Sequence, residues 1–328
     1  MSHDVYPEEN PADLPGEGAP EPRQVAASGP PLRDLSELPL DTQLLHVAHQ
    51  AALSVAPYLK SVARSAPTID TKASIHDPVT VHDKATEESL RRFLSNAVPG
   101  SRFLGEEMGE GGLAPNATSP FIGDVTDLGA RVRWIIDPID GTANFASGLI
   151  YFCTSIAAEL DGKVVAGAIT VPVVGESFLA DATRAWHVGP GGVETKMRAD
   201  GPSSEDTALL ATYYPGLWAL NNRPQMALDH DRALMTNYAT VRRPGAGALD
   251  LAHVAAGWIG VSMGVGFKPW DVAAGIHMVR VAGGKVLNLP MGTDLPDGLR
   301  PGVVSSGANL DARTAKRVLK EVQEARWT

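Results

Sequence analysis

The sequence predicts a mixed fold of the α+β / α/β class, in which one half is built from antiparallel strands and the other from alternating strands and helices. Between residues 151 and 188 the chain contains consecutive short apolar segments separated by turns, which is typical of antiparallel hairpins. From residue 208 onwards strand-like and helix-like segments alternate, which indicates helices packed on a sheet. An apolar fraction of 44% over 328 residues is enough to bury a core for such a fold.

The N-terminal elements are predicted from apolar spacing. Asp41 is the expected N-cap of a first helix whose apolar face extends to about residue 56, and a second helix is predicted over about 84–96. After a short extended segment, 101–104, a buried strand over 132–136 is expected to halt at Asp137-Pro138, because proline cannot donate a ladder hydrogen bond. Four hairpin strands are then predicted over 152–158, 164–171, 177–181 and 185–188.

The C-terminal elements follow from the alternation of strand-like and helix-like patterns. Strands are predicted over 208–212, 239–242 and 258–263, and helices over 224–237, 248–256 and 271–281. The last helix is expected to end before Gly283-Gly284, since glycine commonly terminates helices.

Three stretches of the chain are expected to differ in character. Residues 1–36 are rich in Pro and Glu and are predicted to be a disordered tail. Residues 37–190 are predicted to form an N-terminal α+β half that carries metal-binding loops. Residues 191–328 are predicted to form a C-terminal α/β half, with the division inside the polar, glycine-rich segment 189–206.

Composition argues against several classes of protein. The formal charge of −10 is unlike a surface that binds nucleic acid or an anionic membrane. A single cysteine, Cys153, rules out an intrachain disulfide and a zinc site built from thiolates. No apolar run reaches the ~18 to 20 residues of a membrane span, and no signal-peptide pattern opens the chain. We therefore expect a soluble, acidic, cytoplasmic protein without nucleic-acid or membrane partners.

The most informative segment is WIIDPIDGT, residues 134–142. An apolar strand ends by presenting two carboxylates, Asp137 and Asp140, on either side of a rigid proline. Gly141 allows a ligand to approach the backbone closely, and Thr142 offers a hydroxyl where a helical turn is expected to begin. Two acids on one sharp loop repel each other unless a cation lies between them. A capped turn that uses the acids only for local hydrogen bonds explains the motif equally well.

Three other acidic motifs do not fit this segment. An EF-hand loop needs a Glu at its twelfth position, which is Gly148 here. The aspartyl-phosphate phosphatases space their two acids by two residues, whereas the spacing here is three. The carboxylate pair of a glycoside hydrolase lies across a sugar cleft and not on one tight loop.

Two further acids shift the balance towards a metal site. Glu106 follows the short apolar segment FLG, and Asp271 in KPWD stands at the head of a predicted helix. Each acid alone is more often a solvated loop residue or an N-cap. Together with Asp137 and Asp140 they give four carboxylates at the ends of apolar elements, with no Cys or His beside them. Such hard oxygen ligands favour Mg²⁺ or Mn²⁺ over zinc.

These motifs resemble the inositol monophosphatase family of magnesium-dependent, lithium-sensitive phosphatases, and within it the bacterial inositol monophosphatase-like branch. GEE, WIIDPIDGT and PWDVAAG followed by AGG occur in the family's order, and the resemblance covers roughly residues 40–325. Lys72, Asp77, Thr80 and Asp83 match the family pattern K-x4-D-x2-T-x2-D. The resemblance implies a layered α-β-α-β-α sandwich of the inositol monophosphatase / fructose-1,6-bisphosphatase type. It also implies two or three Mg²⁺ per subunit, with Mn²⁺ as a substitute, and a homodimer.

The resemblance further implies a role for each matching residue. Glu106, Asp137 and the Ile139 carbonyl would hold one metal, and Asp137, Asp140 and Asp271 a second. Thr142, hydrogen-bonded to Asp83, would orient and deprotonate a metal-activated water. The catalytic residues implied by the resemblance are therefore Thr142, Asp83 and Glu106. The residues implied in substrate binding are Asp140, Gly141, Thr142, Gly245, Ala246, Gly247, Gly264 and Lys268. Glu107, Lys72 and Asp77 would support the site from outside the metal ligands.

One position departs from the family. Members that process inositol usually carry a Glu seven residues before the WD aspartate, where this chain has Gly264. We expect the glycine to open space for a larger leaving group, with Lys268 meeting a second anionic group. Poor hydrolysis of myo-inositol 1-phosphate follows, and Gly264→Glu is expected to improve it.

The predicted function is therefore that of a metal-dependent phosphomonoesterase, an Mg-dependent phosphoric monoester hydrolase acting on a small, inositol-phosphate-like metabolite. Related phosphatases for histidinol phosphate, fructose 1,6-bisphosphate or phosphoadenosine phosphate are the enzymatic alternatives. A non-catalytic regulatory member of the same fold is the alternative outside catalysis, although all the implied metal ligands are present.

Overall fold

The computed structural model describes residues 35, 37–64, 69–71, 78–112 and 128–327. The predicted disordered tail, residues 1–36, lies outside the described residues except for Leu35, which is buried. Lys72 and Asp77 also lie outside them. No helix of the described part is both long and apolar enough to cross a bilayer.

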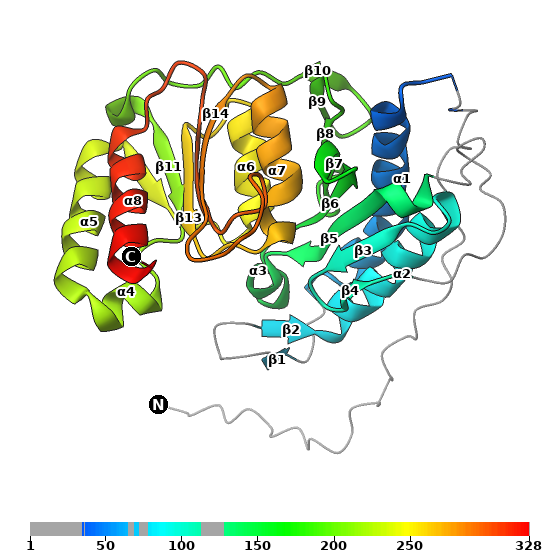
Figure 1. The fold of residues 1–328 in the computed structure, drawn as a ribbon, viewed down its shortest axis with the longest axis horizontal. Coiled ribbons are helices and arrows are strands. Elements are labelled where there is room, and N and C mark those ends of the chain that lie inside the picture. Colours follow the sequence, from blue (N-terminus) through cyan, green and yellow to red (C-terminus); the bar gives the residue numbers. More distant parts are fainter. Residues whose placement is uncertain (1–34, 36, 65–68, 72–77, 113–127, 328) are drawn as a thin grey trace, which may run out of the picture.

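Five layers stack in the order helix, sheet, helix, sheet, helix (Figure 1), which confirms the predicted sandwich. The outer helices of the first half are α1 (Leu40–Val62) and α2 (Val81–Ala97). The central layer consists of α6 (Gly247–Ala255) and α7 (Pro269–Val281). The outer helices of the second half are α4 (Leu217–Asn222), α5 (Pro224–Asn237) and α8 (Arg313–Trp327).

The first sheet has eight strands in the order β10-β9-β8-β7-β6-β5-β3-β4. Their bounds are β3 (Arg102–Gly105), β4 (Gly109–Gly111), β5 (Val132–Asp140), β6 (Cys153–Leu160), β7 (Lys163–Val171), β8 (Glu176–Ala180), β9 (Ala185–Val188) and β10 (Glu194–Lys196). Strands β5 to β10 pair antiparallel, as the hairpin pattern predicts, while β3 runs parallel to β5. Strand β10 carries this sheet beyond the predicted division at residue 190, and that division stays a prediction.

Two predicted boundaries in this half are wrong. Strand β5 does not halt at Asp137 but continues to Asp140, with a shift of register against β6 between these residues. Pro138 lies at this irregularity, where the missing N–H breaks no regular ladder. Asp41 is not an N-cap: it lies inside the first turn of α1 after Pro39, and its carboxylate accepts a hydrogen bond from the Ala182 N–H.

The second sheet has five strands in the order β12-β11-β13-β15-β14. Their bounds are β11 (Leu209–Thr212), β12 (Thr240–Arg242), β13 (Val261–Val265), β14 (Lys285–Leu289) and β15 (Gly302–Ser306). The alternation predicted β11, β12, α5, α6 and α7, whereas α4, β14, β15 and α8 were not foreseen. Strand β13 starts later than predicted because Trp258 lies in a turn after α6 and is 54% exposed.

Smaller elements complete the part of the chain that the structure describes. A two-stranded sheet pairs β1 (Ile69–Thr71) with β2 (Pro78–Thr80). The short helix α3 (Thr142–Ala146) follows β5, and 3-10 turns cover Gly129–Arg131 and Glu205–Thr207.

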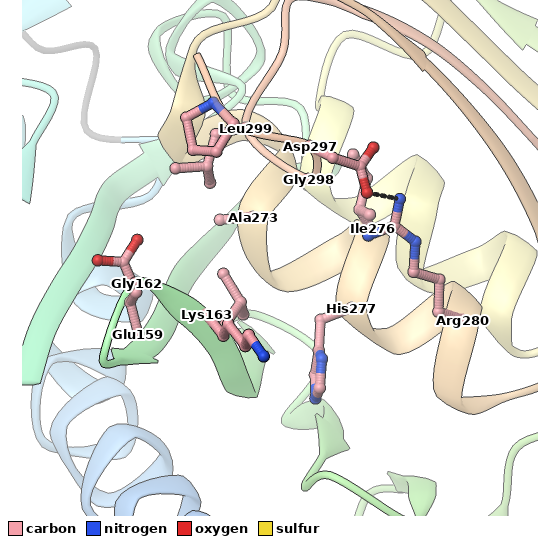
Figure 2. Close-up of a pocket in the computed structure, with 12 residues that line it drawn as sticks. Glu159, Gly162, Lys163, Ala273, Ile276, His277, Arg280, Asp297, Gly298 and Leu299 are labelled. Carbon is pink, nitrogen blue, oxygen red and sulfur yellow. Dashed lines mark hydrogen bonds and ion pairs between the residues drawn. The ribbon is translucent and has the colours of Figure 1, made fainter.

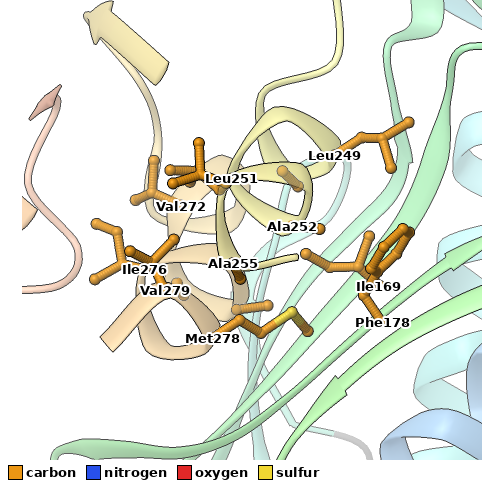
Figure 3. Close-up of a cluster of buried hydrophobic side chains, with 14 of the residues drawn as sticks. Ile169, Phe178, Leu249, Leu251, Ala252, Ala255, Val272, Ile276, Met278 and Val279 are labelled. Atoms are coloured by element: carbon orange, nitrogen blue, oxygen red, sulfur yellow. The ribbon is translucent and has the colours of Figure 1, made fainter. Parts of the chain in front are cut away.

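The central helices join the two sheets through one apolar core. Leu249 and Ala252 of α6 and Ile276 of α7 are buried in the same cluster as Ile169 and Phe178 of the first sheet (Figure 3). Burial of about 25 cal/mol per Å² of apolar surface favours this packing. The starts of α6 and α7 are thereby fixed against the end of β5, where the predicted acids lie.

Candidate active site

A pocket of about 260 Å³ gathers most of the predicted site residues. Of the residues expected to bind metal or substrate, those that line it are Glu106, Asp137, Ile139, Asp140, Gly141, Thr142, Gly245, Gly247 and Asp271. They come from the ends of β3 and β5 and from the segments where α3, α6 and α7 begin. Segments far apart in the sequence therefore meet at one place, as the combination of motifs predicted.

Strand pairing brings the first two acids together. In the parallel pair of β3 and β5, Gly105 lies opposite Ile136, and the Glu106 N–H donates to the Ile136 carbonyl at 3.2 Å. Glu106 is therefore placed beside Asp137. The Asp137 Oδ1 accepts a hydrogen bond from the Ile139 N–H at 3.1 Å, which fixes the carboxylate within the turn.

The other two acids are positioned by the starts of helices. Asp271, the third residue of α7, accepts a hydrogen bond from the Lys268 N–H at 2.8 Å. Asp140 accepts hydrogen bonds from the Gly247 and Ala248 N–H groups at 3.1 and 2.8 Å, and so supports the start of α6. A carboxylate is favourable at both places because a helix N-terminus carries partial positive charge.

Gly141 allows the chain to turn between β5 and α3. Its φ of 94° lies in the left-handed region, and a Cβ there would meet the carbonyl oxygens of Tyr151 and Gly245 at 3.0 and 3.1 Å. A side chain at this position would be strained and crowded at once. The following Thr142 is thereby directed towards Asp83.

The acids of the pocket resist ionisation. Burial raises the pKa of Asp137 well above its ordinary range, and the charges of Glu106, Asp140 and Asp271 raise it further. Burial, with the charge of Asp250, raises the pKa of Asp140 to about 7, although the amides of α6 oppose the shift. The pKa of Asp271 is raised by exclusion of water and by Asp140.

This arrangement suits a hard divalent cation chemically. The donors that line the pocket are carboxylates and a backbone carbonyl, and no imidazole or thiol is among its described lining residues. A cation would offset the repulsion between the acids. Over the described ranges, no three His, Cys, Asp or Glu side chains stand in the arrangement of a ready-made metal site. The ligand roles, that of Asp140 above all because its oxygens face the α6 amides, therefore stay predictions.

A hydroxyl and a buried carboxylate adjoin the acids. Thr142 Oγ1 lies 3.0 Å from Asp83 Oδ1 and 3.0 Å from the Ile139 carbonyl oxygen, so its single proton is shared between two acceptors. Asp83 is fully buried at the start of α2, where its Oδ2 accepts hydrogen bonds from the Thr80 N–H and hydroxyl. The hydrogen bond implied between Thr142 and Asp83 is thus present.

Comparison with known proteins decides the family. The family model described as the inositol monophosphatase family matches residues 40–325. This chain belongs to the inositol monophosphatase family. Its members are metal-dependent phosphatases that act on small phosphorylated substrates.

Relatives and solved structures agree with this assignment. The inositol-1-monophosphatase of Mesorhizobium japonicum is 31% identical over 287 residues, 86% of this chain and 98% of that protein. The Nus factor SuhB of Pseudomonas aeruginosa is 33% identical over 74% of this chain and 84% of its own. The extragenic suppressor protein suhB of Bartonella henselae superposes with a TM-score of 0.64 at 29% identity, covering 87% of this chain and 98% of that one. The family fold, with its bacterial branch, is therefore confirmed.

The family motifs did not reveal the residues that position the site. Glu87 of α2 is fully buried, pairs with Arg91, and accepts hydrogen bonds from the Glu107 and Met108 N–H groups. It therefore holds the turn that carries Glu106. The spacing of Glu87 and Arg91 by four on a predicted helix was the available signal, but surface pairs share that spacing.

A second group of polar residues that the motifs missed connects the two halves. Asp250 of α6 is fully buried and accepts hydrogen bonds from the hydroxyls of Tyr151 and Tyr213 at 2.6 and 2.7 Å. Asn144 of α3 donates to the carbonyls of Tyr151 and Pro244 at 2.7 and 2.8 Å. Tyr213 lines the pocket, so this network reaches the site directly.

The space expected at Gly264, where inositol-processing family members carry a Glu, is not open. A Cβ on Gly264 would lie 2.1 Å from Cε2 of Phe267, and a Cβ on Gly247 would lie 2.8 Å from Cε1 of the same ring. The ring therefore fills the expected opening, and that prediction is wrong. Ala246 is buried behind Gly141, and Lys268 is exposed, so their predicted substrate contacts stay predictions.

A second cavity of about 240 Å³ lies at the other end of α7, away from the acids (Figure 2). Lys163 and His277 line it, and Arg280 pairs with Asp297 at 2.6 Å on its rim. None of the residues predicted for metal or substrate is among its described lining residues. The predicted metal- and substrate-binding residues that line a pocket therefore gather at the acidic pocket and not at this cavity.

Proposed function

We propose that this chain is an Mg²⁺-dependent phosphomonoesterase that hydrolyses a small phosphorylated metabolite in the acidic pocket. The single observation that carries the proposal is the convergence of Glu106, Asp137 and Asp271 on one pocket beside the Thr142–Asp83 pair. The family membership supports the same reaction class.

The reaction breaks the bond between phosphorus and the ester oxygen, and a water oxygen takes the place of the alcohol. Uncatalysed hydrolysis of such esters is among the slowest reactions known. The carboxylates of Glu106, Asp137, Asp140 and Asp271, with the Ile139 carbonyl, would hold two or three Mg²⁺ ions. Bound Mg²⁺ supplies neutralisation of the phosphate dianion and a lowered pKa for water.

Thr142 and Asp83 would orient the attacking water. Thr142 donates a hydrogen bond to Asp83. The lone pairs of Thr142 Oγ1 are therefore available to accept a hydrogen bond from that water. The two further hydrogen bonds from Thr80 hold Asp83 in place. This water would therefore be directed along one line of approach to the phosphorus atom.

The phosphate itself would be bound by backbone groups at the start of α3. The N–H groups of Gly141 and Thr142 lie where the chain leaves β5, and both residues line the pocket. Fixed amide dipoles stabilise negative charge without reorganising during the reaction. The positive φ of Gly141 makes this close approach sterically feasible.

Further properties of the proposal rest on the family membership. We include a homodimer, a cytoplasmic location, and inhibition by lithium at millimolar levels through the site formed by Asp137, Asp140 and Asp271. In the lithium test, phosphate release is measured at fixed ionic strength with lithium or sodium chloride. Equal rates in the two salts would contradict the assignment of that site.

Phosphate release from a panel of esters tests the proposed function. The chain is treated with EDTA, exchanged into buffer, and assayed on polyol, sugar, amino-alcohol and nucleoside phosphates with and without Mg²⁺. We expect release from at least one ester only when Mg²⁺ is present. No phosphate release from any ester would favour the non-catalytic alternative. That alternative is in line with the name of two relatives, which are called Nus factor SuhB.

A further inference from the structure

We propose that the pocket selects phosphate esters whose alcohol carries a planar aromatic ring, bound against a wall formed by Tyr213 and Phe267. This aromatic wall lines the same pocket as the acids and is contributed by the segments after β11 and β13. The inference rests on the proposed function, because it concerns the leaving group of the same reaction.

The two rings form one contiguous surface. Their centroids are 5.4 Å apart and their planes are inclined by 71°, an edge-to-face contact. Aromatic rings prefer this geometry. Phe267 is 8% exposed and Tyr213 is half-buried, so a third ring would meet only the part of each ring that lines the pocket. Both residues are among those that line the pocket.

Each ring is held in position. The Phe267 ring lies over the Cα atoms of Gly247 and Gly264, where any side chain would collide with it. The Phe267 N–H donates to the Pro301 carbonyl, which anchors the loop before α7. The Tyr213 hydroxyl donates to the buried carboxylate of Asp250 at 2.7 Å, which directs the ring towards the pocket.

The remaining wall offers few partners to a polyol. Apart from the acids, Ile139 and Thr142, the described lining residues are Gly141, Tyr213, Gly245, Gly247, Val265, Gly266 and Phe267. None of these seven carries a charged side chain, and the proton of the one hydroxyl among them is already donated to Asp250. A ring of free hydroxyls on the leaving group would lose water there and find few side-chain partners for its hydrogen bonds.

An aromatic leaving group suits the same surface. Ring faces and edges gain contact with Tyr213 and Phe267 and require no polar partner. The cavity of about 260 Å³ must also hold the phosphate, so the part of the alcohol inside it is small. Of the alternatives raised by the sequence, the esters with a heteroaromatic ring therefore fit this wall better than the sugar bisphosphate.

The test compares two esters with equal intrinsic reactivity. Phenethyl phosphate and cyclohexylethyl phosphate are both esters of primary alcohols and differ in whether the six-membered ring is planar. We expect the wild-type chain with Mg²⁺ to favour phenethyl phosphate in kcat/KM by about tenfold. Glycerol phosphate is assayed beside them as a polar ester.

Phe267→Leu removes the ring and keeps an apolar side chain. We expect it to reduce the preference for phenethyl over cyclohexylethyl phosphate to about twofold or less. Trp218→Leu is the matched control, because Trp218 stacks on Trp327 at the outer helices and not at the pocket. Equilibrium binding of phenethylphosphonate, which cannot be hydrolysed at its P–C bond, measures the same contrast without turnover.

The outcomes separate this inference from the proposed function. No Mg²⁺-dependent release from any ester, phenethyl phosphate included, overturns the proposed function. Release without a preference for the planar ring overturns the aromatic wall alone, as does a preference that Phe267→Leu leaves unchanged. If Phe267→Leu fails to fold, Tyr213→Leu makes the same comparison from the other ring.

Discussion

The two sides of the pocket are built from different parts of the chain and by different rules. The acidic side comes mainly from the first sheet, where β3 and β5 end, and each carboxylate is held by backbone N–H groups or by a neighbouring acid. The aromatic wall comes from the second sheet and is held by close packing on Gly247 and Gly264. The carboxylates are therefore oriented mainly by hydrogen bonds from the backbone, whereas the Phe267 ring is held by packing on the backbone of β13 and of the start of α6.

The largest expected effect lies on the acidic side. Asp137→Asn keeps the acceptor for the Ile139 N–H but removes the charge shared between both implied metal sites. We expect kcat to fall by about a thousandfold on every ester, equivalent to several kcal/mol of transition-state stabilisation. The melting temperature should hold or rise in the absence of metal, because repulsion from the neighbouring acids is relieved.

The control for this variant is Asp294→Asn, an exposed acid of the second half. It should change neither kcat nor the melting temperature measurably. Near-normal turnover by Asp137→Asn at saturating Mg²⁺ would contradict the assignment of the acidic side.

The second effect lies behind the aromatic wall. Burial raises the pKa of Asp250 from 3.8 to about 7, so at intermediate pH the folded chain holds a proton that the unfolded chain has released. The free energy of unfolding therefore falls as pH rises from the unfolded pKa of Asp250 towards its folded pKa, and it is constant above the folded pKa. The total fall is about 1.4 kcal/mol for each unit by which folding raises the pKa. Asp250→Asn should remove this contribution; its amide oxygen still accepts from one tyrosine hydroxyl, while its NH2 group donates to the oxygen of the other.

Urea unfolding between about pH 5 and pH 8 measures how the free energy of unfolding depends on pH in wild type and in Asp250→Asn. This interval roughly spans the titration of Asp250 in the folded chain. We expect the variant to lose less stability than wild type as pH rises. Parallel curves for the two proteins would show that Asp250 is ionised throughout the range.

A third effect tests the packing of the wall. Gly264→Glu forces a side chain into the Phe267 ring, and such overpacking typically costs about 1–3 kcal/mol of stability. We expect a lower melting temperature and no gain in turnover of myo-inositol 1-phosphate, the reverse of the expectation from the family motif. Gly216→Glu is the control, since a Cβ there meets no atom within 4 Å. Improved turnover of inositol phosphate by Gly264→Glu would contradict this expectation and show that the Phe267 ring moves aside to accommodate the glutamate side chain.

The smallest effect is expected at the N-terminus. The composition of residues 1–31 cannot supply a core, and no implied ligand lies among them. Their deletion should leave melting temperature and specific activity unchanged within error. The cut is placed before Leu35 because that side chain is buried. A large loss of either quantity would show that the tail contributes to the folded part.

The sequence predicted the acidic side better than the wall for a physical reason. Glu106, Asp137 and Asp271 each follow or begin an apolar element, so their positions relative to the backbone are local properties. The Phe267 ring also packs on Gly247 at the start of α6, twenty residues earlier in the chain, and no local pattern encodes that contact. The expectation that proline ends a strand misplaced the end of β5, because β5 continues through a shift of register. The expectation that Asp41 is an N-cap misplaced the start of α1, because this carboxylate instead accepts a hydrogen bond from Ala182.

The fold was predicted in the same uneven way. Hairpins β6 to β9 were recognised because turn residues separate apolar runs, and the alternation identified α5, α6 and α7. Strands β14 and β15 were missed, although they pair with each other and with β13, because nothing in the local pattern of that region marks them as strands. Helix α8 was missed although its buried residues follow the helical period.

The measurement that tests the account most directly is kcat/KM on phenethyl and cyclohexylethyl phosphate for wild type, Asp137→Asn and Phe267→Leu, with Mg²⁺ present. The account predicts that Asp137→Asn lowers both values by the same factor and preserves their ratio, because the acids act on the phosphate common to both esters. Phe267→Leu should instead change the ratio. A ratio altered by Asp137→Asn, or one unaffected by Phe267→Leu, would contradict the division of the pocket into an acidic side for chemistry and an aromatic wall for selection.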